Sequence, residues 1–198
     1  MVRRLRAAGA VVIGTTTMPE FGQFPFTESV AFGVTRNPRD ISRSPGGSSG
    51  GTAVALAAGV APIGLGADGG GSIRVPAACT GVVELKTSRG RVSPAPLTDH
   101  WLGLVTLGGL TRTAADHAML LDAIAGSLPA DRWQLPNPQE PFALTAAGDP
   151  GPRRIAWTTR SVTPGRPAGR GRHRGDRAPA RRFGPPGAAH DGAVAGLH

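Results

Sequence analysis

The stretch GGSSGGTAVALAAGVAPIGLGADGGGS, residues 46–72, carries the pattern that decides the fold. It opens with a turn rich in glycine and serine that leads directly into a helix of small residues over 53–59. Residues 61–66 then form an apolar run typical of a buried strand, and that strand ends in a second turn of the same composition. A helix and a strand therefore separate two similar turns, as expected in a layered α/β structure.

The flanking sequence extends this alternation of helices and apolar strands. Short runs that are apolar or end at glycine predict strands, and capped or amphipathic runs predict helices. We expect helices at 2–9 and 114–126, the second capped by Thr113, and strands at 10–14, 81–86 and 90–93. The fold class predicted from these elements is α/β.

The composition excludes several classes of protein. The chain has 198 residues, of which 39% are hydrophobic and 18% charged, and it contains one cysteine. A single cysteine excludes an internal disulfide framework and a zinc site built on several thiolates. The histidines show no metal-ligand spacing, and no apolar run is long enough to cross a membrane. We therefore expect a cytoplasmic protein with no metal, no cofactor and no membrane partner.

Most of the net charge of +9 lies in the segment 151–198, which carries ten arginines and two aspartates. This segment is rich in glycine and proline and shows no sustained apolar period, so we predict a disordered basic tail after a folded domain over 1–150. Because this segment begins abruptly near Trp157, our hypothesis is that a frameshift in the coding DNA produced the tail. An Arg-rich nucleic-acid-binding protein is the alternative from another functional class, although few aromatic residues are present for base stacking.

The second glycine-rich turn has the composition of a site that binds an oxyanion. Gly69, Gly70 and Gly71 leave the backbone N–H groups before Ser72 unhindered by side chains, as the stabilisation of a developing oxyanion requires. A phosphate-binding loop and a tight structural turn are the alternatives. No Gly-Lys-Ser/Thr follows either turn, and the glycine spacing does not match the dinucleotide fingerprint, so the two common nucleotide motifs are excluded.

Together the two turns resemble the amidase signature family of Ser-Ser-Lys hydrolases. The resemblance rests on residues 46–51 and 68–78 and extends over much of residues 2–130. It implies a partial amidase-signature α/β/α fold, in which helices flank a mixed sheet. It also implies that the substrate is a small-molecule amide whose carboxamide C–N bond is hydrolysed without a cofactor.

The resemblance also implies a role for each serine. Ser72 matches the nucleophile that forms an acyl-enzyme, and Ser48 matches the serine that relays its proton and is held in the family by a cis peptide bond. Ser49 is the competing candidate for the relay, but the spacing of 24 residues to Ser72 favours Ser48.

The surrounding loop matches the family as well. The backbone N–H groups from Gly69 to Ser72, with Gly69, Gly70 and Gly71 at their centre, correspond to the oxyanion hole. Asp68 and Arg74 are expected to brace this loop without touching the substrate.

The family's third catalytic group, a lysine, has no counterpart in this sequence. Lys86 is the only lysine, and it matches a structural position of the family. The catalytic lysine of the family lies further before the double-serine turn than Met1 reaches. We therefore expect a truncated member with little or no turnover by itself, and a non-catalytic relic is the alternative. A companion chain and a homo-oligomer both stay open as partners.

One further departure from the family concerns a predicted strand. Glu84 stands where the family usually has glycine. A carboxylate on a central strand needs a partner, because burying it without one costs several kcal/mol.

Overall fold

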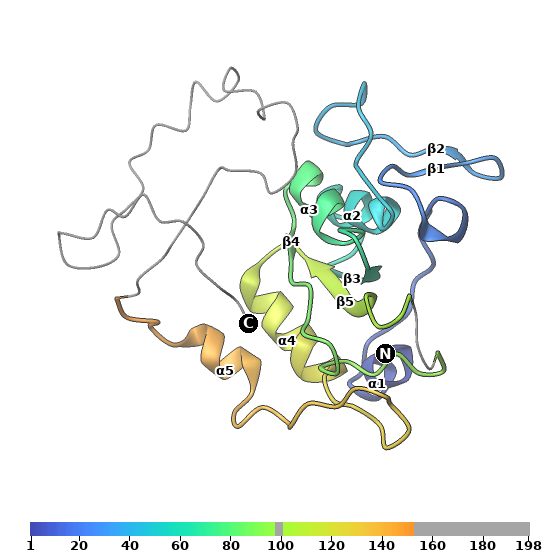
Figure 1. Ribbon diagram of the computed structural model, residues 1–198. Coiled ribbons are helices and arrows are strands. Elements are labelled where there is room, and N and C mark those ends of the chain that lie inside the picture. Colours follow the sequence, from blue (N-terminus) through green and yellow to red (C-terminus); the bar gives the residue numbers. More distant parts are fainter. Residues whose placement is uncertain (98–100, 153–198) are drawn as a thin grey trace, which may run out of the picture. The chain divides into compact units, whose positions relative to one another are not determined.

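A three-stranded sheet forms the centre of this computed structural model, which describes residues 1–97 and 101–152. Strand β5 (Thr106–Thr111) lies in the middle and pairs antiparallel with β3 (Ile63–Asp68) on one side and with β4 (Val83–Glu84) on the other. A separate pair of short strands, β1 (Glu28–Ser29) and β2 (Gly33–Val34), is also antiparallel. Figure 1 shows this second pair beyond α2, at the edge of the structure.

Helices cover both faces of the central sheet (Figure 1). On one face α2 (Gly50–Ala57) and α3 (Arg74–Thr80) pack on β5, with a core of buried Ala53, Leu56, Ile73, Ala77 and Leu110. On the other face α1 (Val2–Ala7) and α4 (Ala114–Ile124) form a second core around Leu5, Val92, Leu120 and Ile124. The predicted α/β class, with a sheet between helices, is therefore confirmed.

The alternation of side chains along β3 explains how α2 reaches the sheet. Ile63 and Leu65 point toward the core under α4, so Gly64 and Gly66 point toward α2. A Cβ atom on Gly66 would lie 2.7 Å from Ser49 Oγ. Because Gly66 has no side chain, the turn before α2 rests directly on the strand.

Several elements predicted from the sequence are confirmed. Helix α1 lies within 2–9, α2 begins at the first glycine-rich turn, and β3 includes most of 61–66. Helix α4 begins where expected, because the Thr113 side chain accepts a hydrogen bond of 3.1 Å from the Asp116 N–H. This is the N-cap contact that a capping box predicts.

Two predicted strands are wrong. Residues 10–14 form no strand, and Val11 and Ile13 are 84% and 70% exposed. The run has the composition of a buried strand, but no strand among the described residues pairs with it. Residues 90–93 also form no strand, and Val92 makes only an isolated bridge to Gly126.

The remaining described elements are short and lie outside the central layers. They are the 3-10 helix η1 (Glu20–Gly22) and helix α5 (Phe142–Ala147). Residues Met1–Gly148 form one compact unit. The predicted boundary at residue 150 stays a prediction, and the predicted disordered tail over 151–198, with its frameshift hypothesis, lies almost wholly outside the described residues.

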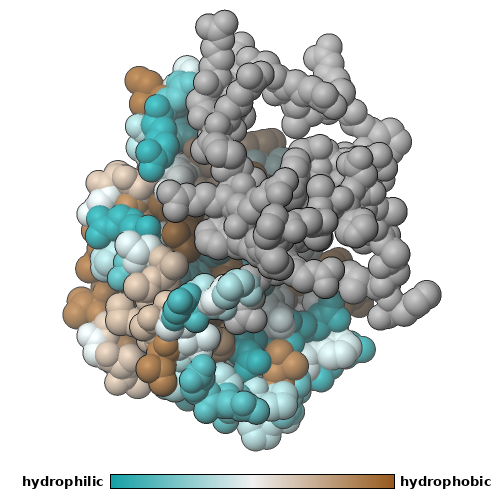
Figure 2. Space-filling model, turned by 90° about the vertical axis from the view of Figure 1, so that its left-hand side faces the viewer, coloured by the Kyte–Doolittle hydropathy of each residue, from teal (hydrophilic) through white to brown (hydrophobic). Residues whose placement is uncertain are grey.

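The surface of the described part is not uniformly polar. Figure 2 shows apolar residues interspersed with polar ones over one side of the molecule. No helix in the described ranges is both long enough and apolar enough to cross a bilayer. Within the same ranges, no group of three or more His, Cys, Asp or Glu side chains is placed to hold a metal ion.

Candidate active site

The two serine-bearing turns lie side by side in the structure. The Ser49 backbone N–H donates a hydrogen bond of 2.9 Å to the Ser72 carbonyl oxygen. The Gly47–Ser48 peptide bond is cis, the form that the family resemblance implies at this position. The fold therefore brings together two loops that are separated in sequence by α2 and β3.

The side chains of Ser48 and Ser49 face different surroundings. Ser48 is 6% exposed, and its Oγ lies 3.3 Å from where a Cβ atom on Gly22 would stand. Ser49 Oγ lies against Gly66 of β3. Among the described residues, the hydroxyls of Ser48 and Ser72 form no hydrogen bond with each other. Catalytic hydrogen bonds often become short and well aligned only when substrate binds.

Asp68 organises the loop that ends in Ser72. Its side chain is fully buried and accepts backbone N–H hydrogen bonds from Gly71 at 2.8 Å and from Ile73 and Arg74 at 3.2 Å each. The Arg74 guanidinium adds Nε at 3.0 Å and Nη2 at 2.8 Å. The carboxylate thus fixes both the backbone before Ser72 and the first residue of α3.

Lys86 holds Asp68 from another direction. Its Nζ donates to the Asp68 carbonyl oxygen, and it lies 3.0 Å from the Leu104 carbonyl oxygen and 3.5 Å from Asp68 Oδ1. Burial acts to raise the pKa of Asp68, but the hydrogen bonds from Arg74 and from the Ile73 N–H and the charge of Lys86 outweigh it. The pKa of Asp68 therefore lies well below its usual value, and the carboxylate is ionised at neutral pH.

The backbone N–H groups around Ser72 divide into two sets. Those of Gly71, Ile73 and Arg74 donate to the Asp68 carboxylate. No described residue accepts a hydrogen bond from the N–H groups of Gly69, Gly70 or Ser72. The first set holds the loop in shape, and the second is the set available to an incoming carbonyl oxygen.

Glu84 lies near this cluster without joining its hydrogen bonds. Its Oε2 atom is buried and has no hydrogen-bond partner among the described residues. Burial raises the pKa of Glu84, and the negative charge of Asp68 raises it further, against the opposing charges of Arg74 and Lys86. The sequence indicated that a carboxylate here would need a partner, and the structure supplies none for that oxygen.

Sequence reasoning missed the residues that cover the glycine-rich loop. A Cβ atom on Gly69 would lie 2.9 Å from Trp101 Cε3 and 3.1 Å from Val105 Cγ2. A Cβ atom on Gly70 would have no atom within 4 Å. No motif in the sequence predicts this contact, because Trp101 and Val105 reach the loop only through the tertiary fold.

Comparison with known proteins identifies relatives of this chain. The family model described as Amidase matches residues 1–169. AmiB2 of Mycobacterium tuberculosis, which bears the provisional name of an amidase, is 51% identical over 164 residues, covering 83% of this chain and 34% of that protein. The 6-aminohexanoate-cyclic-dimer hydrolase of Paenarthrobacter ureafaciens is 44% identical over 161 residues, covering 80% of this chain and 33% of that protein.

Solved structures of two hydrolases are also similar to this chain. A 6-aminohexanoate cyclic dimer hydrolase complexed with substrate superposes with a TM-score of 0.73 at 43% identity, covering 76% of this chain and 32% of that one. The native peptide amidase of Stenotrophomonas maltophilia superposes with a TM-score of 0.67 at 42% identity, covering 72% of this chain and 31% of that one. The chain spans about a third of the length of the curated relatives it matches.

Proposed function

The chain belongs to the amidase family, and from this premise we propose that it carries part of an active site that hydrolyses a carboxamide C–N bond through an acyl-enzyme on Ser72. The observation that carries the proposal is the pairing of the two serine loops through the Ser49 N–H and the Ser72 carbonyl oxygen. This contact holds the proposed relay, Ser48, next to the loop of the proposed nucleophile. A small-molecule amide as substrate, no cofactor and a cytoplasmic location belong to the same proposal.

The proposed chemistry begins with attack of Ser72 Oγ on the amide carbonyl carbon. As the Oγ–C bond forms, negative charge develops on the carbonyl oxygen, and the N–H groups of Gly69, Gly70 and Ser72 stabilise it. Ser48 passes the Ser72 proton to a base, the amine leaves with a proton, and water then hydrolyses the ester on Ser72. Asp68 and Arg74 hold the loop and do not touch the substrate.

The proposed mechanism needs a base to accept the Ser72 proton, and the serine loops do not supply one. Lys86 is the only lysine among the 198 residues, and its Nζ is held by the Asp68 and Leu104 carbonyl oxygens near a carboxylate. These contacts direct Nζ toward the backbone of the glycine-rich loop, and among the described residues it forms no hydrogen bond with Ser48 or Ser72, so we assign Lys86 a structural role. We therefore propose that this chain, taken alone, hydrolyses amides very slowly. A role as a non-catalytic relic is the alternative that the same observation favours.

Labelling with a fluorophosphonate tests the nucleophile independently of turnover. In this reaction the Ser72 Oγ–P bond forms, the P–F bond breaks, and fluoride leaves as the serine proton passes to solvent. We expect slow labelling at Ser72, located by peptide mass spectrometry, that is lost in Ser72→Ala and slowed in Ser48→Ala. Ser88→Ala, at an exposed position, is the matched control and should label like the unmodified chain. Labelling that persists in Ser72→Ala would refute the assignment of the nucleophile.

An added alkylamine tests the missing base. If the chain lacks only a proton acceptor, ethylamine at alkaline pH should accelerate the labelling of Ser72, and it should accelerate Ser48→Ala much less. Equal acceleration in both proteins would contradict the relay through Ser48. Amide hydrolysis by the chain without added amine that is as fast as with it, and that is abolished in Ser72→Ala, would contradict the proposed lack of a base.

A further inference from the structure

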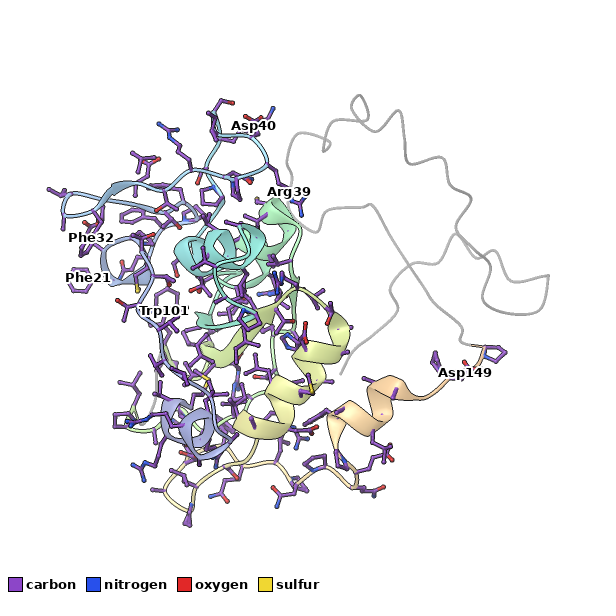
Figure 3. The ribbon with its side chains drawn as sticks, turned by 180° about the vertical axis from the view of Figure 1, so that it is seen from behind. Phe21, Phe32, Arg39, Asp40, Trp101 and Asp149 are labelled. Carbon is purple, nitrogen blue, oxygen red and sulfur yellow. The ribbon has the colours of Figure 1, made fainter. Side chains whose placement is uncertain are left out.

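Trp101 both covers part of the glycine-rich loop and faces solvent. Its indole packs where a side chain on Gly69 would stand, 2.9 Å from the position of the missing Cβ atom. Yet Trp101 is 43% exposed, so this packing leaves much of the side chain accessible. Figure 3 shows Trp101 on the same side of the molecule as Phe21 and Phe32. The indole therefore combines a contact to the loop with a surface that another molecule can reach.

The loop is open immediately beyond this contact. Gly70 is exposed, and a Cβ atom there would meet nothing within 4 Å. Its N–H group and that of Ser72 belong to the set that Asp68 does not use. A carbonyl oxygen bound by this set would therefore place its substituents near the border formed by Trp101 and Val105 over Gly69.

We propose that Trp101 selects the substrate by contacting an apolar group attached to the scissile amide. The proposal rests on the proposed function, because it takes the Gly69–Ser72 loop as the place where the amide carbonyl binds. An indole offers a large apolar face, and contact with an alkyl or aryl group removes apolar area of both partners from water. The substrate class is therefore a carboxamide with an alkyl or aryl substituent beside the carbonyl or on the nitrogen, in preference to a small amide such as acetamide.

Equilibrium binding measures this preference without requiring turnover. The probes are acetamide, butyramide and N-ethylacetamide, titrated into the ¹⁵N-labelled full chain and followed by the NMR shifts of the loop amides. Two added methylenes that are half removed from water tighten binding about fourfold. We expect this gain over acetamide for one of the two longer amides. The amide that shows the gain identifies which side of the amide group, carbonyl or nitrogen, faces Trp101.

Substitutions then assign the preference to Trp101. Trp101→Ala should reduce the gain to nearly onefold, whereas Trp101→Phe should keep most of it because an aromatic face remains. Leu144→Ala, which truncates a side chain that is 61% exposed on α5, is the control and should leave the gain unchanged. Heteronuclear spectra of each variant establish that it is folded before its affinities are compared.

The outcomes separate this inference from the proposed function. An unchanged gain in Trp101→Ala, or no amide binding by the unmodified chain, would overturn the role of Trp101. Ser72→Ala should keep the gain, because it removes only the nucleophilic hydroxyl. No fluorophosphonate labelling at Ser72 in the unmodified chain, together with a gain that depends on Trp101, would refute the nucleophile while leaving the binding preference in place.

Discussion

Replacing Asp68 by Asn removes the charge that holds the loop before Ser72 while keeping the shape of the side chain. The carboxylate is fully buried. Oδ1 accepts from the Gly71 N–H and Arg74 Nη2, and Oδ2 accepts from the N–H groups of Ile73 and Arg74 and from Arg74 Nε. An amide replaces one of these oxygens by an NH₂ group, which is itself a donor. At least two of the hydrogen bonds are therefore lost in Asp68→Asn.

The size of the effect follows from these contacts. A hydrogen bond to a charged group contributes about 1.5 kcal/mol at the lower end of its range, so two lost bonds destabilise the fold by about 3 kcal/mol. Larger values are not expected, because the Arg74 side chain is 48% exposed and regains water when its partner loses charge. For a domain of this size the melting temperature should fall by about 6 to 12 °C.

Denaturant unfolding at pH 7 measures this loss directly, and Asp40→Asn is the matched control. Asp40 also pairs with an arginine, Arg43 at 2.8 Å, but both side chains are largely exposed, at 46% and 67%. We expect Asp68→Asn to lower the unfolding midpoint without changing the m-value, and Asp40→Asn to leave both unchanged. A midpoint for Asp68→Asn equal to that of the control would refute the view that this carboxylate holds the loop.

The pH dependence gives a second check on the same residue. Burial alone would raise the pKa of Asp68, but its hydrogen bonds with Arg74 and the charge of Lys86 lower it in the folded state. A lowered pKa means that the stabilisation is fully present above the unfolded value of about 3.9 and is lost as the pH falls from there through the folded pKa. The difference between the unmodified chain and Asp68→Asn should therefore be constant from pH 7 to pH 5 and shrink below about pH 4. A difference that instead disappears between pH 7 and pH 5 would contradict this assignment.

Three other changes have outcomes that the structure predicts. Glu84→Gln should stabilise the chain by about 1 kcal/mol at pH 7, because burial raises the pKa of Glu84 and makes its charged form costly. This cost develops as the pH rises from the usual pKa of a glutamate through the raised pKa of Glu84 in the folded chain. Unfolding at pH 4 should show a much smaller gain, and equal stability of the two proteins at pH 7 would count against a buried, unpartnered Oε2. His117→Gln should flatten the loss of stability on acidification, because burial lowers the pKa of His117 and protonation in the unfolded state begins near pH 6.5. Melting temperatures of both proteins from pH 7 to pH 5 measure this loss of stability. Parallel curves for the two proteins would refute the contribution of His117. Gly69→Ala should destabilise the fold by about 1 to 3 kcal/mol and shift the fluorescence of Trp101, because the methyl group meets the indole. Gly70→Ala meets no atom within 4 Å and should do neither, so equal effects of the two substitutions would contradict the described contact.

The sequence predicted those elements whose signals are local. Helix α4 begins with a side-chain cap that any reader of the sequence can find, and the hydrogen bond from the Asp116 N–H to Thr113 Oγ1 is present at 3.1 Å. Strand β3 is a short apolar run between turn residues, and it forms near the expected place. Such signals depend on neighbours in the chain, so they do not need the rest of the fold to be known.

The elements that the sequence did not predict depend on tertiary contacts. Strand β5 contains Gly108 and Gly109, which lower its intrinsic preference for a strand, yet a Cβ atom on Gly109 would lie only 2.9 Å from the Gly64 carbonyl oxygen. The close approach of β3 therefore requires glycine at position 109. Helix α3 contains Pro76, which is tolerated because it lies in the first turn, where an N–H group has no partner within the helix.

The same distinction applies to the candidate site. Glycine content alone predicts that every N–H group from Gly69 to Ser72 is equally available to an oxyanion. In the structure the Gly71 N–H already donates to Asp68 at 2.8 Å, so its geometry is set by a buried carboxylate three residues earlier. A donor whose hydrogen already points at an ionised oxygen contributes less to a new charge. In the proposed mechanism the stabilisation of an oxyanion therefore falls on the N–H groups of Gly69, Gly70 and Ser72, while Gly71 holds the turn that orients them. A glycine-rich sequence leaves these two tasks indistinguishable, and only the position of the Asp68 side chain separates them.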